Sequence, residues 1–202
     1  MDSRTEAEQQ IIDAATKVFI AKGFKAATMK DIATEANTAL SMTNYYFRSK
    51  KQLFDLIFDR VFDAMYGQLK TIDFSKSLFE IIENFVEVYS ASLAKIPAIP
   101  NFIFAELSHN PERMVLKVKE RQDLNRMIDT IQKKFDQEYQ NGVIKKVDPF
   151  TIIINIEALC AFPFLAHPLI ECVTTTVGFK CDDILKEQNR NIARFVIDAI
   201  KA

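Results

Sequence analysis

The sequence predicts an all-α protein, and three observations lead to that fold class. The 202 residues contain only 4 Gly and 6 Pro, so few positions interrupt regular structure. Apolar residues recur every three or four positions over most of the chain, which is helical spacing. Hydrophobic residues make up 49% and charged residues 26%, an ordinary balance for a chain that buries a core. The length fits one large domain or two small ones.

Charge and cysteine usage narrow the functional classes. The net charge is -1, so any nucleic-acid site must be local. Residues 1–51 hold eight basic and six acidic side chains, a weak local bias of +2. The three cysteines, Cys160, Cys172 and Cys181, are odd in number and lack a C-x-x-C spacing, which predicts reduced thiols and a cytoplasmic protein. The N-terminus has no signal-peptide core, and the longest apolar stretch is too short to span a bilayer.

Residues 5–50 predict one helix followed by two short helices. The first carries apolar residues at helical spacing from Ile11 and stops at Gly23, which can take the left-handed conformation that ends helices. The second starts at Thr28, an expected N-cap with Asp31 in the position of a capping box. The third covers 39–46, with Ser41 or Thr43 as its expected cap. Two short helices joined by a tight turn have the geometry of a helix-turn-helix.

The remaining sequence also predicts helices, separated by proline, glycine and polar breaks. Pro97 and Pro100 interrupt the pattern after the fifth helix, and Gly142 closes a long charged one. Asp148 is the expected cap of the next helix, which is apolar along nearly its whole length and is therefore expected to be buried on most sides. These helices are expected over residues 51–69, 75–95, 101–108, 112–141, 149–166 and 182–201.

Two segments in order carry a family resemblance. "IIDAATKVFIAKGFKAATMKDIATEA", followed by "NYYFRSKKQLF", resembles the N-terminal DNA-binding domain of the TetR family of transcription regulators. The resemblance covers residues 8–58. The shared features are, in order, Ala-Ala then Phe in the first helix, the Gly-Phe turn, Thr28, Asp-Ile-Ala in the second helix, and the junction aromatic-Phe-x-Ser-Lys-x-x-Leu. The segment 37–41 departs from the family's usual Gly-containing turn, although Asn37 can also adopt a left-handed conformation. Asn44 stands where the family often has tyrosine.

The resemblance implies a helix-turn-helix domain over 1–48 and a helical ligand-binding and dimerisation domain over 49–202. Neighbouring helical residues point about 100° apart, so the rings of Tyr45, Tyr46 and Phe47 cannot share one face. Phe47 is expected to pack inward while the tyrosines face phosphates. Asn44 suits an adenine edge, and Leu40 and Met42 suit thymine methyl groups. The expected DNA-binding residues are Thr28, Lys30, Ala39, Leu40, Ser41, Met42, Asn44, Tyr45, Tyr46 and Lys50.

The resemblance further implies ligand-responsive transcription control, usually repression, by a homodimer on a near-palindromic operator. The two last long helices are the expected dimer interface. Asn155 and Glu157, polar residues of the apolar helix, face either a ligand pocket or the partner subunit. A small apolar ligand, with no cofactor, is expected between the middle helices. Its expected wall comprises Phe62, Met65, Tyr66, Phe85, Tyr89, Phe102, Phe104, Met127, Ile131, Phe162 and Phe164.

Other functional classes fit the sequence less well. The unusual segment 37–41 motivates one rival, a helical small-molecule binding module that has lost specific DNA binding. An enzyme is disfavoured because no Ser-His-Asp order, paired carboxylates or glycine-rich phosphate loop is recognisable. His109 and His167 lack metal-ligand spacing. Cys160 is expected to be buried and inert, with redox sensing as the alternative.

Overall fold

The computed structural model describes residues 6–95 and 97–202, and it gives the backbone alone for Met65, Gln68, Asp123 and Leu124. Over these residues the fold is all-α, as the sequence predicts, and the one β-contact is an isolated bridge between Ile144 and Lys201. The elements in chain order are α1 (Glu6–Ala26), α2 (Met29–Glu35), α3 (Leu40–Tyr46), α4 (Lys50–Tyr66), the 3-10 helix η1 (Gly67–Thr71), α5 (Leu78–Lys95), α6 (Ile99–His109), α7 (Pro111–Glu120), α8 (Gln122–Gln140), α9 (Pro149–Leu165), α10 (His167–Thr176) and α11 (Cys181–Ile200).

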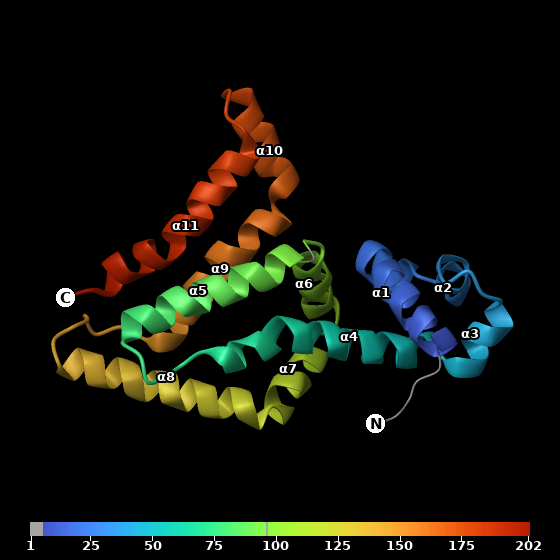
Figure 1. Ribbon diagram of the computed structural model, residues 1–202, viewed down its shortest axis with the longest axis horizontal. Coiled ribbons are helices and arrows are strands. Elements are labelled where there is room, and N and C mark those ends of the chain that lie inside the picture. Colours follow the sequence, from blue (N-terminus) through green and yellow to red (C-terminus); the bar gives the residue numbers. More distant parts are fainter. Residues whose placement is uncertain (1–5, 96) are drawn as a thin grey trace.

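Helices α1 to α3 form a small lobe at one end of the molecule, and α4 runs from this lobe into the rest of the chain (Figure 1). α1 packs against α2, α4 and α6, and α2 packs against α3. Ile12, Phe19 and Ile32 are fully buried in the lobe. Phe47 is also buried, at 5% exposure, so the prediction that this ring turns inward is confirmed.

Local sequence signals fix the boundaries inside the lobe. Gly23 has φ 72°, which ends the regular part of α1. The Asp31 N–H donates to Thr28 Oγ1 at 3.1 Å, while Asp31 Oδ2 accepts from the Thr28 N–H at 2.9 Å, so the capping box is confirmed. The Lys22 ammonium, which pairs with Asp31 at 2.9 Å, and next the Thr28 bonds lower the pKa of Asp31 to about 2. Asn37 has φ 49° and completes a Schellman-type turn after α2, with Thr38 N–H donating to Ala33 O at 3.0 Å.

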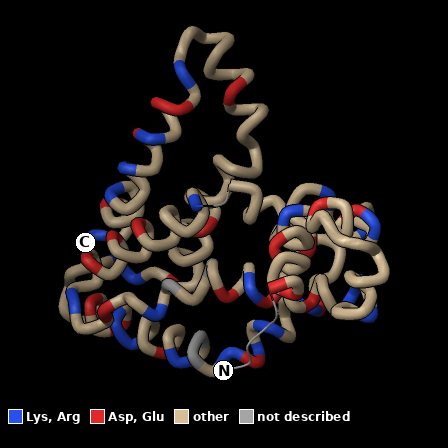
Figure 2. Tube along the Cα trace, turned by 45° about the vertical axis from the view of Figure 1, so that its right-hand side comes forward, with Lys and Arg blue, Asp and Glu red and all other residues tan. Residues whose placement is uncertain are grey.

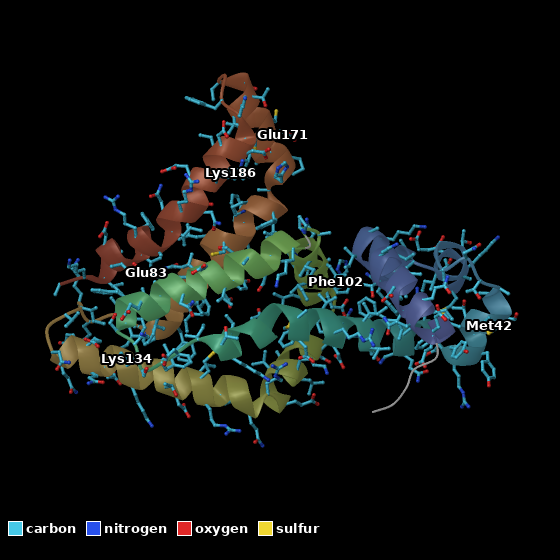
Figure 3. The ribbon with its side chains drawn as sticks, viewed as in Figure 1. Met42, Glu83, Phe102, Lys134, Glu171 and Lys186 are labelled. Carbon is cyan, nitrogen blue, oxygen red and sulfur yellow. The ribbon has the colours of Figure 1, made fainter. Side chains whose placement is uncertain are left out.

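The larger part of the chain is built around α5. This helix contacts α4, α8, α9 and α11, and its Ile82, Phe85 and Leu93 are buried. α6 joins the two parts, because it packs against α1 on one side and α9 on the other. α10 and the first half of α11 extend away from this bundle as an arm, on which Figure 3 labels Glu171 and Lys186 (Figures 1 and 3). The fold therefore consists of a lobe, a connecting helix, a bundle and an arm.

Several expected helix boundaries are wrong, and the break at Arg121 depends on a contact between helices that are far apart in the chain. The single helix expected over 112–141 is two helices that break at Arg121 (φ -91°, ψ 85°). Neither Gly nor Pro marks this break, and Arg121 is held by an ion pair with Asp63 of α4. The helix expected over 51–69 ends at Tyr66 and continues as η1. Helix α10 was not expected, because β-branched and polar residues dominate "HPLIECVTTT" and weaken its helical pattern.

Two details of the expected packing also need correction. α3 has Ala39 as its N-cap with no side-chain hydrogen bond, so neither Ser41 nor Thr43 caps it, and Thr43 is instead fully buried. α9 is not buried on most sides in the single chain. Its Phe150, Ile154 and Phe162 are 47%, 64% and 58% exposed, because the other helices cover only one face of it. Asp148 does cap this helix, as expected.

The length and apolarity of the helices also bear on membrane insertion. Among the described residues, no single helix is both long and apolar enough to cross a bilayer. α9 and α10 reach the required length and composition only when they are joined, and a bend of 73° separates them.

Candidate nucleic-acid interface and interior polar cluster

α3 presents most of the expected DNA-binding residues to solvent at the outer end of the lobe, where Figure 3 labels Met42. Leu40 and Met42 are 42% and 43% exposed, and Tyr45 is 78% exposed. The Tyr45 and Tyr46 rings meet edge to face at 5.4 Å, with Tyr46 partly buried. α3 is thus anchored by Thr43 and Phe47 on one side and free on the other. Thr28, Lys30, Ala39, Ser41 and Asn44 are exposed as well.

Basic side chains border this surface, and Figure 2 shows Lys and Arg segments along the outer side of the lobe. Three of the lysines are neutralised by acids: Lys17 by Glu35, Lys22 by Asp31 and Lys51 by Asp55, at 3.2, 2.9 and 2.8 Å. The other exposed bases of the lobe, Lys25, Lys30 and Arg48, form no ion pair with any described residue. The exposed helix and these bases together make a surface that suits a phosphate backbone.

The Lys50 side chain also forms hydrogen bonds within the protein. Its ammonium donates to the carbonyl oxygens of Phe24 and Ala27, at 2.8 and 2.9 Å, and lies 4.5 Å from the centre of the Phe24 ring. The Phe24 carbonyl belongs to the last turn of α1 and the Ala27 carbonyl lies just beyond it, where helical partners are missing. An ammonium has three N–H groups, so one is left for the phosphate contact that the sequence predicts.

Replacing Lys50 by alanine is expected to lower the free energy of unfolding by about 1–3 kcal/mol, because two carbonyls lose a charged donor. The matched control is Lys51→Ala, which removes an exposed ion pair and should change stability by less than about 0.5 kcal/mol. Urea denaturation of both variants measures the difference. Equal stability of the two variants would mean that the Lys50 bonds contribute nothing to α1.

Two rows of side chains on α4 connect the lobe with the bundle. On one side, Phe54, Phe58, Phe62 and Tyr66 form an aromatic row with successive ring centres 6.3, 6.2 and 4.6 Å apart. Phe54 also meets Phe19 and Phe24 of α1, at 5.0 and 4.8 Å, and Phe102 of α6 at 5.6 Å. Phe102, labelled in Figure 3, lies where α6 reaches the lobe.

Next to the aromatic row on α4, three acids pair with two basic residues of α7 and with Arg121, which directly follows α7. Asp55 pairs with Arg113 at 2.5 Å, Asp59 pairs with Lys117 at 2.7 Å, and Asp63 pairs with Arg121. Arg113 also binds Glu106 of α6, which is 5% exposed, at 3.1 Å. This ladder of ion pairs was not predicted from the sequence. Its signal was the repeat of acids every four residues in α4 and of bases every four residues from 113 to 121.

The expected ligand-wall residues do not form one continuous wall. Phe62, Phe85, Tyr89, Phe102 and Ile131 are buried, and Tyr66, Met127 and Phe164 are partly buried. Phe104 and Phe162 are 41% and 58% exposed, so they lie on the surface of the single chain and not in the interior. The side chain of Met65 lies outside the described residues.

The interior of the bundle has one small cavity near these residues. Phe85 and Ile131 line it together with Ile82, Ile153 and Ile156, and its volume is about 30 Å³. That volume holds about one water molecule. A larger molecule therefore requires side chains to move.

A polar cluster lies beside this cavity, at the junction of α4, α5 and α9. It consists of Tyr66, Tyr89, Ser90, Glu157 and Cys160. Burial raises the pKa of Tyr66 and Tyr89 and also of Glu157, and the charge of Glu157 adds to the shift of both tyrosines. Ser90 lies 3.4 Å from the Cys160 sulfur, and burial raises the pKa of this thiol. We call this group the Tyr–Glu cluster.

The structure separates the two polar residues of α9. Asn155 is exposed on the same side of the helix as Ile154 and Phe162, whereas Glu157 is partly buried and belongs to the Tyr–Glu cluster. Asn155 therefore lies on the face expected to meet a partner subunit, and Glu157 lies toward the interior.

Among the described residues, no group of three or more potential metal ligands occurs.

Comparisons with known proteins agree with this architecture. Residues 11–57 match the family model described as "Bacterial regulatory proteins, tetR family". The HTH-type transcriptional regulator YhgD of Bacillus subtilis (strain 168) is 27% identical over 157 residues, which cover 76% of this chain and 81% of the relative.

Solved structures show the same fold over nearly the whole length. A TetR family transcriptional regulator from Pseudomonas syringae pv. tomato has a TM-score of 0.64 at 18% identity, covering 100% of this chain and 99% of that one. HlyIIR, a hemolysin II transcriptional regulator, has a TM-score of 0.60 at 17% identity, covering 98% of both chains. A transcriptional regulator of Streptomyces coelicolor reaches a TM-score of 0.69 at 17% identity over 96% of this chain and 98% of that chain. At these identities the likeness concerns the fold.

Proposed function

We propose that this chain is a transcription regulator of the TetR family, and that it is a homodimeric repressor that a small ligand releases from a near-palindromic operator. The observation that carries the proposal is the exposed side of α3, where Leu40, Met42 and Tyr45 are accessible. The basic side chains of Lys25, Lys30 and Arg48 on the same lobe form no ion pair with a described residue. We also propose a domain boundary at residue 48, so that the DNA-reading lobe ends before α4. The same reading makes the protein a cytoplasmic regulator and not an enzyme.

We divide the DNA-binding residues into two kinds. Asn44 reads base edges, with Leu40 and Met42 beside it, because an amide pairs with adenine and apolar side chains contact thymine methyls. Tyr45, Lys30 and the free ammonium N–H of Lys50 position the lobe on phosphates. Thr28, Ala39, Ser41 and Tyr46 complete the contact surface around them.

Removing a base contact and removing a phosphate contact are expected to reduce DNA affinity in different ways. Asn44→Ala is expected to weaken binding to the operator by about tenfold to hundredfold per half-site and to relax discrimination at one base pair of each half-site, while binding to random DNA stays unchanged. Tyr45→Phe is expected to weaken binding to both DNAs alike, because a phosphate contact carries no sequence information.

Fluorescence anisotropy on operator and random duplexes at one stated salt concentration measures both losses. The control is Gln9→Ala, whose amide bonds Asp13 within α1, away from α3. If Asn44→Ala and Tyr45→Phe leave both affinities unchanged, α3 is not the reading helix. That result would favour the rival function, a small-molecule binding module without DNA reading.

The dimer is proposed to form through α9 and α11. Ile154 and Phe162 of α9 and Phe195 of α11 are exposed by 58–67%, and contiguous exposed apolar surface of this kind marks interfaces. Leu169, Val173 and Val177 extend the apolar surface onto the α10 arm. A two-fold dimer places two copies of α3 on successive major grooves. The ligand acts by binding one spacing of the two lobes more tightly than the other.

A further inference from the structure

A cleft lies between the DNA-reading lobe and the bundle, where α1 and α6 face each other (Figure 1). Its volume is about 490 Å³, which suits a small molecule, whereas the bundle cavity of about 30 Å³ holds about one water molecule. Aromatic rings from three helices line the cleft, with neighbouring ring centres 4.8 to 6.4 Å apart: Phe19 and Phe24 of α1, Phe54 of α4 and Phe102 of α6. The cleft therefore has room and an apolar lining for a ligand with an aromatic body.

Glu106 of α6 lines this cleft with a carboxylate that is only half engaged, although the residue is 5% exposed. Its Oε1 accepts from Asn110 Nδ2 at 3.0 Å and pairs with Arg113 Nε at 3.1 Å. Its Oε2 has neither a hydrogen bond nor an ion pair with any described residue. Because Oε2 is not among the fully enclosed side-chain atoms without a partner, it keeps some accessible surface. A ligand in the cleft can therefore complete the carboxylate by donating to Oε2.

The neighbouring polar side chains of the cleft also present acceptors. His109 Nδ1 lies 2.6 Å from the carbonyl oxygen of the preceding turn, which can only accept, so Nδ1 carries the proton and Nε2 of the neutral ring accepts. Asn110 donates one N–H to Glu106 and Asn101 donates one N–H to the Phe164 carbonyl, at 3.0 and 3.5 Å. Each of these two amides keeps its Oδ1 as an acceptor, for which no described residue is a donor, together with one N–H. The α6 side of the cleft thus presents more open acceptors than donors.

The charged side chains around the cleft are largely balanced within the protein. Arg113 already pairs with the Glu106 carboxylate on the α6 side. On the α1 side, Lys22 pairs with Asp31 at 2.9 Å, and Lys25 lines the cleft but is exposed to solvent. A ligand in the cleft therefore needs hydrogen-bond donors more than it needs a net charge.

We propose that this cleft binds a neutral aromatic ligand that carries O–H or N–H donors, with its ring among the four phenylalanines and one donor on Glu106 Oε2. An anionic ligand would meet the carboxylate, and a ligand with acceptors alone would leave Oε2 unbonded. This inference rests on the proposed function, because it assigns the releasing ligand a place and a chemical class. A ligand that contacts both α1 and α6 changes DNA binding if its affinity differs between two orientations of the lobe.

Three probes that share one ring system but differ in hydrogen bonding and charge test the ligand class directly. They are 2,7-dihydroxynaphthalene, 2,7-dimethoxynaphthalene and naphthalene-2,7-dicarboxylate, titrated into the full-length protein without DNA and followed by isothermal calorimetry. The diol is expected to bind at least about tenfold more tightly than the other two, since a hydrogen bond to a charged acceptor contributes of that order. Any other order of affinities, or no binding of the diol, overturns the inference.

Glu106→Gln inverts the chemistry of one contact while keeping the shape of the side chain. The amide oxygen is expected to stay on the donors of Asn110 and Arg113, because an amide nitrogen cannot accept from them, so the N–H groups face the cleft. The diol should then bind at least about tenfold more weakly, while the dimethoxy compound, whose oxygens accept, should bind no more weakly than before. The control is Glu112→Gln, which removes an exposed carboxylate of α7 outside the cleft lining and should leave all three affinities unchanged. Unchanged diol binding in Glu106→Gln contradicts the assignment.

A second variant blocks the cleft and leaves its buried carboxylate in place. Ala105 of α6 is exposed and lines the cleft, so Ala105→Trp puts an indole into the space that the ligand needs. This variant is expected to lose detectable binding of the diol. Leu107→Trp is the matched control, because Leu107 lies on the same helix, is 40% exposed and is not part of the cleft lining. Full diol affinity in Ala105→Trp would place the diol elsewhere and overturn the site.

Failure of the cleft site is distinguishable from failure of the proposed function. Calorimetry needs no DNA, so a wrong order of probe affinities overturns the cleft site and leaves operator binding standing. Failure to bind any specific DNA would overturn the proposed function, while the order of the three probes would still decide the cleft site. The diol is also expected to weaken operator binding in fluorescence anisotropy, and unchanged operator affinity at saturating diol would overturn its role in release.

Discussion

Ile154→Asp is expected to convert the dimer to monomers and to weaken operator binding by more than about hundredfold. Ile154 is 64% exposed in the single chain, on the outer face of α9. In a two-fold interface each copy contributes the substitution, and a buried aspartate without a partner costs several kcal/mol. Monomers also lose the gain of about 10² to 10⁴ that comes from binding two linked half-sites.

Sedimentation equilibrium and DNA anisotropy measure the two effects on the same sample. The matched control is Leu116→Asp on α7, a residue that is 59% exposed but lies away from α9 and α11. This control should remain dimeric and bind operator normally. A dimeric Ile154→Asp protein with full operator affinity would place the interface elsewhere.

Phe54→Ala is expected to lower the free energy of unfolding by about 3–5 kcal/mol, the range for a large side chain removed from a packed core. Phe54 is 1% exposed and touches rings of α1 and α6 as well as its own helix. The Arg113 guanidinium lies 4.9 Å from its ring centre, so this cation also loses a partner. Because Phe54 joins the lobe to the bundle, both parts lose packing.

Chemical denaturation followed by circular dichroism measures this loss. Phe104→Ala is the control, because the ring of Phe104 is 41% exposed and should contribute less than about 1 kcal/mol. Similar stability of the two variants would mean that the aromatic contacts between lobe and bundle are not a core.

The parts of the fold that sequence predicted correctly depend on neighbours in the chain. The Thr28–Asp31 capping box, the left-handed residues Gly23 and Asn37, and the Asp148 cap are decided within a few residues. The break at Arg121 could not be predicted in this way. It occurs at a residue that binds an acid 58 positions away.

The same distinction applies to the site. The exposed side of α3 could be predicted because neighbouring helical residues point in different directions, so that the tyrosines face outward when Phe47 turns inward. The burial of Thr43, which was expected as a cap, could not be predicted. The interior residues were predicted from apolarity alone, which does not tell a buried ring from an exposed one. Phe102 is buried and Phe104 is exposed although both were expected to line the ligand site, since only packing of α6 on its neighbours decides between them. The convergence of Glu157 with Tyr66 and Tyr89 likewise requires three helices to meet.

We propose above that a dimer of this chain reads DNA through α3. Selection from a random pool of double-stranded DNA, with purified protein at moderate salt, tests it most directly. We expect enrichment of a two-fold symmetric motif whose half-sites lie on successive major grooves, and loss of base preference within each half-site for Asn44→Ala. Enrichment of no motif, or of one that Asn44→Ala leaves unchanged, would contradict it.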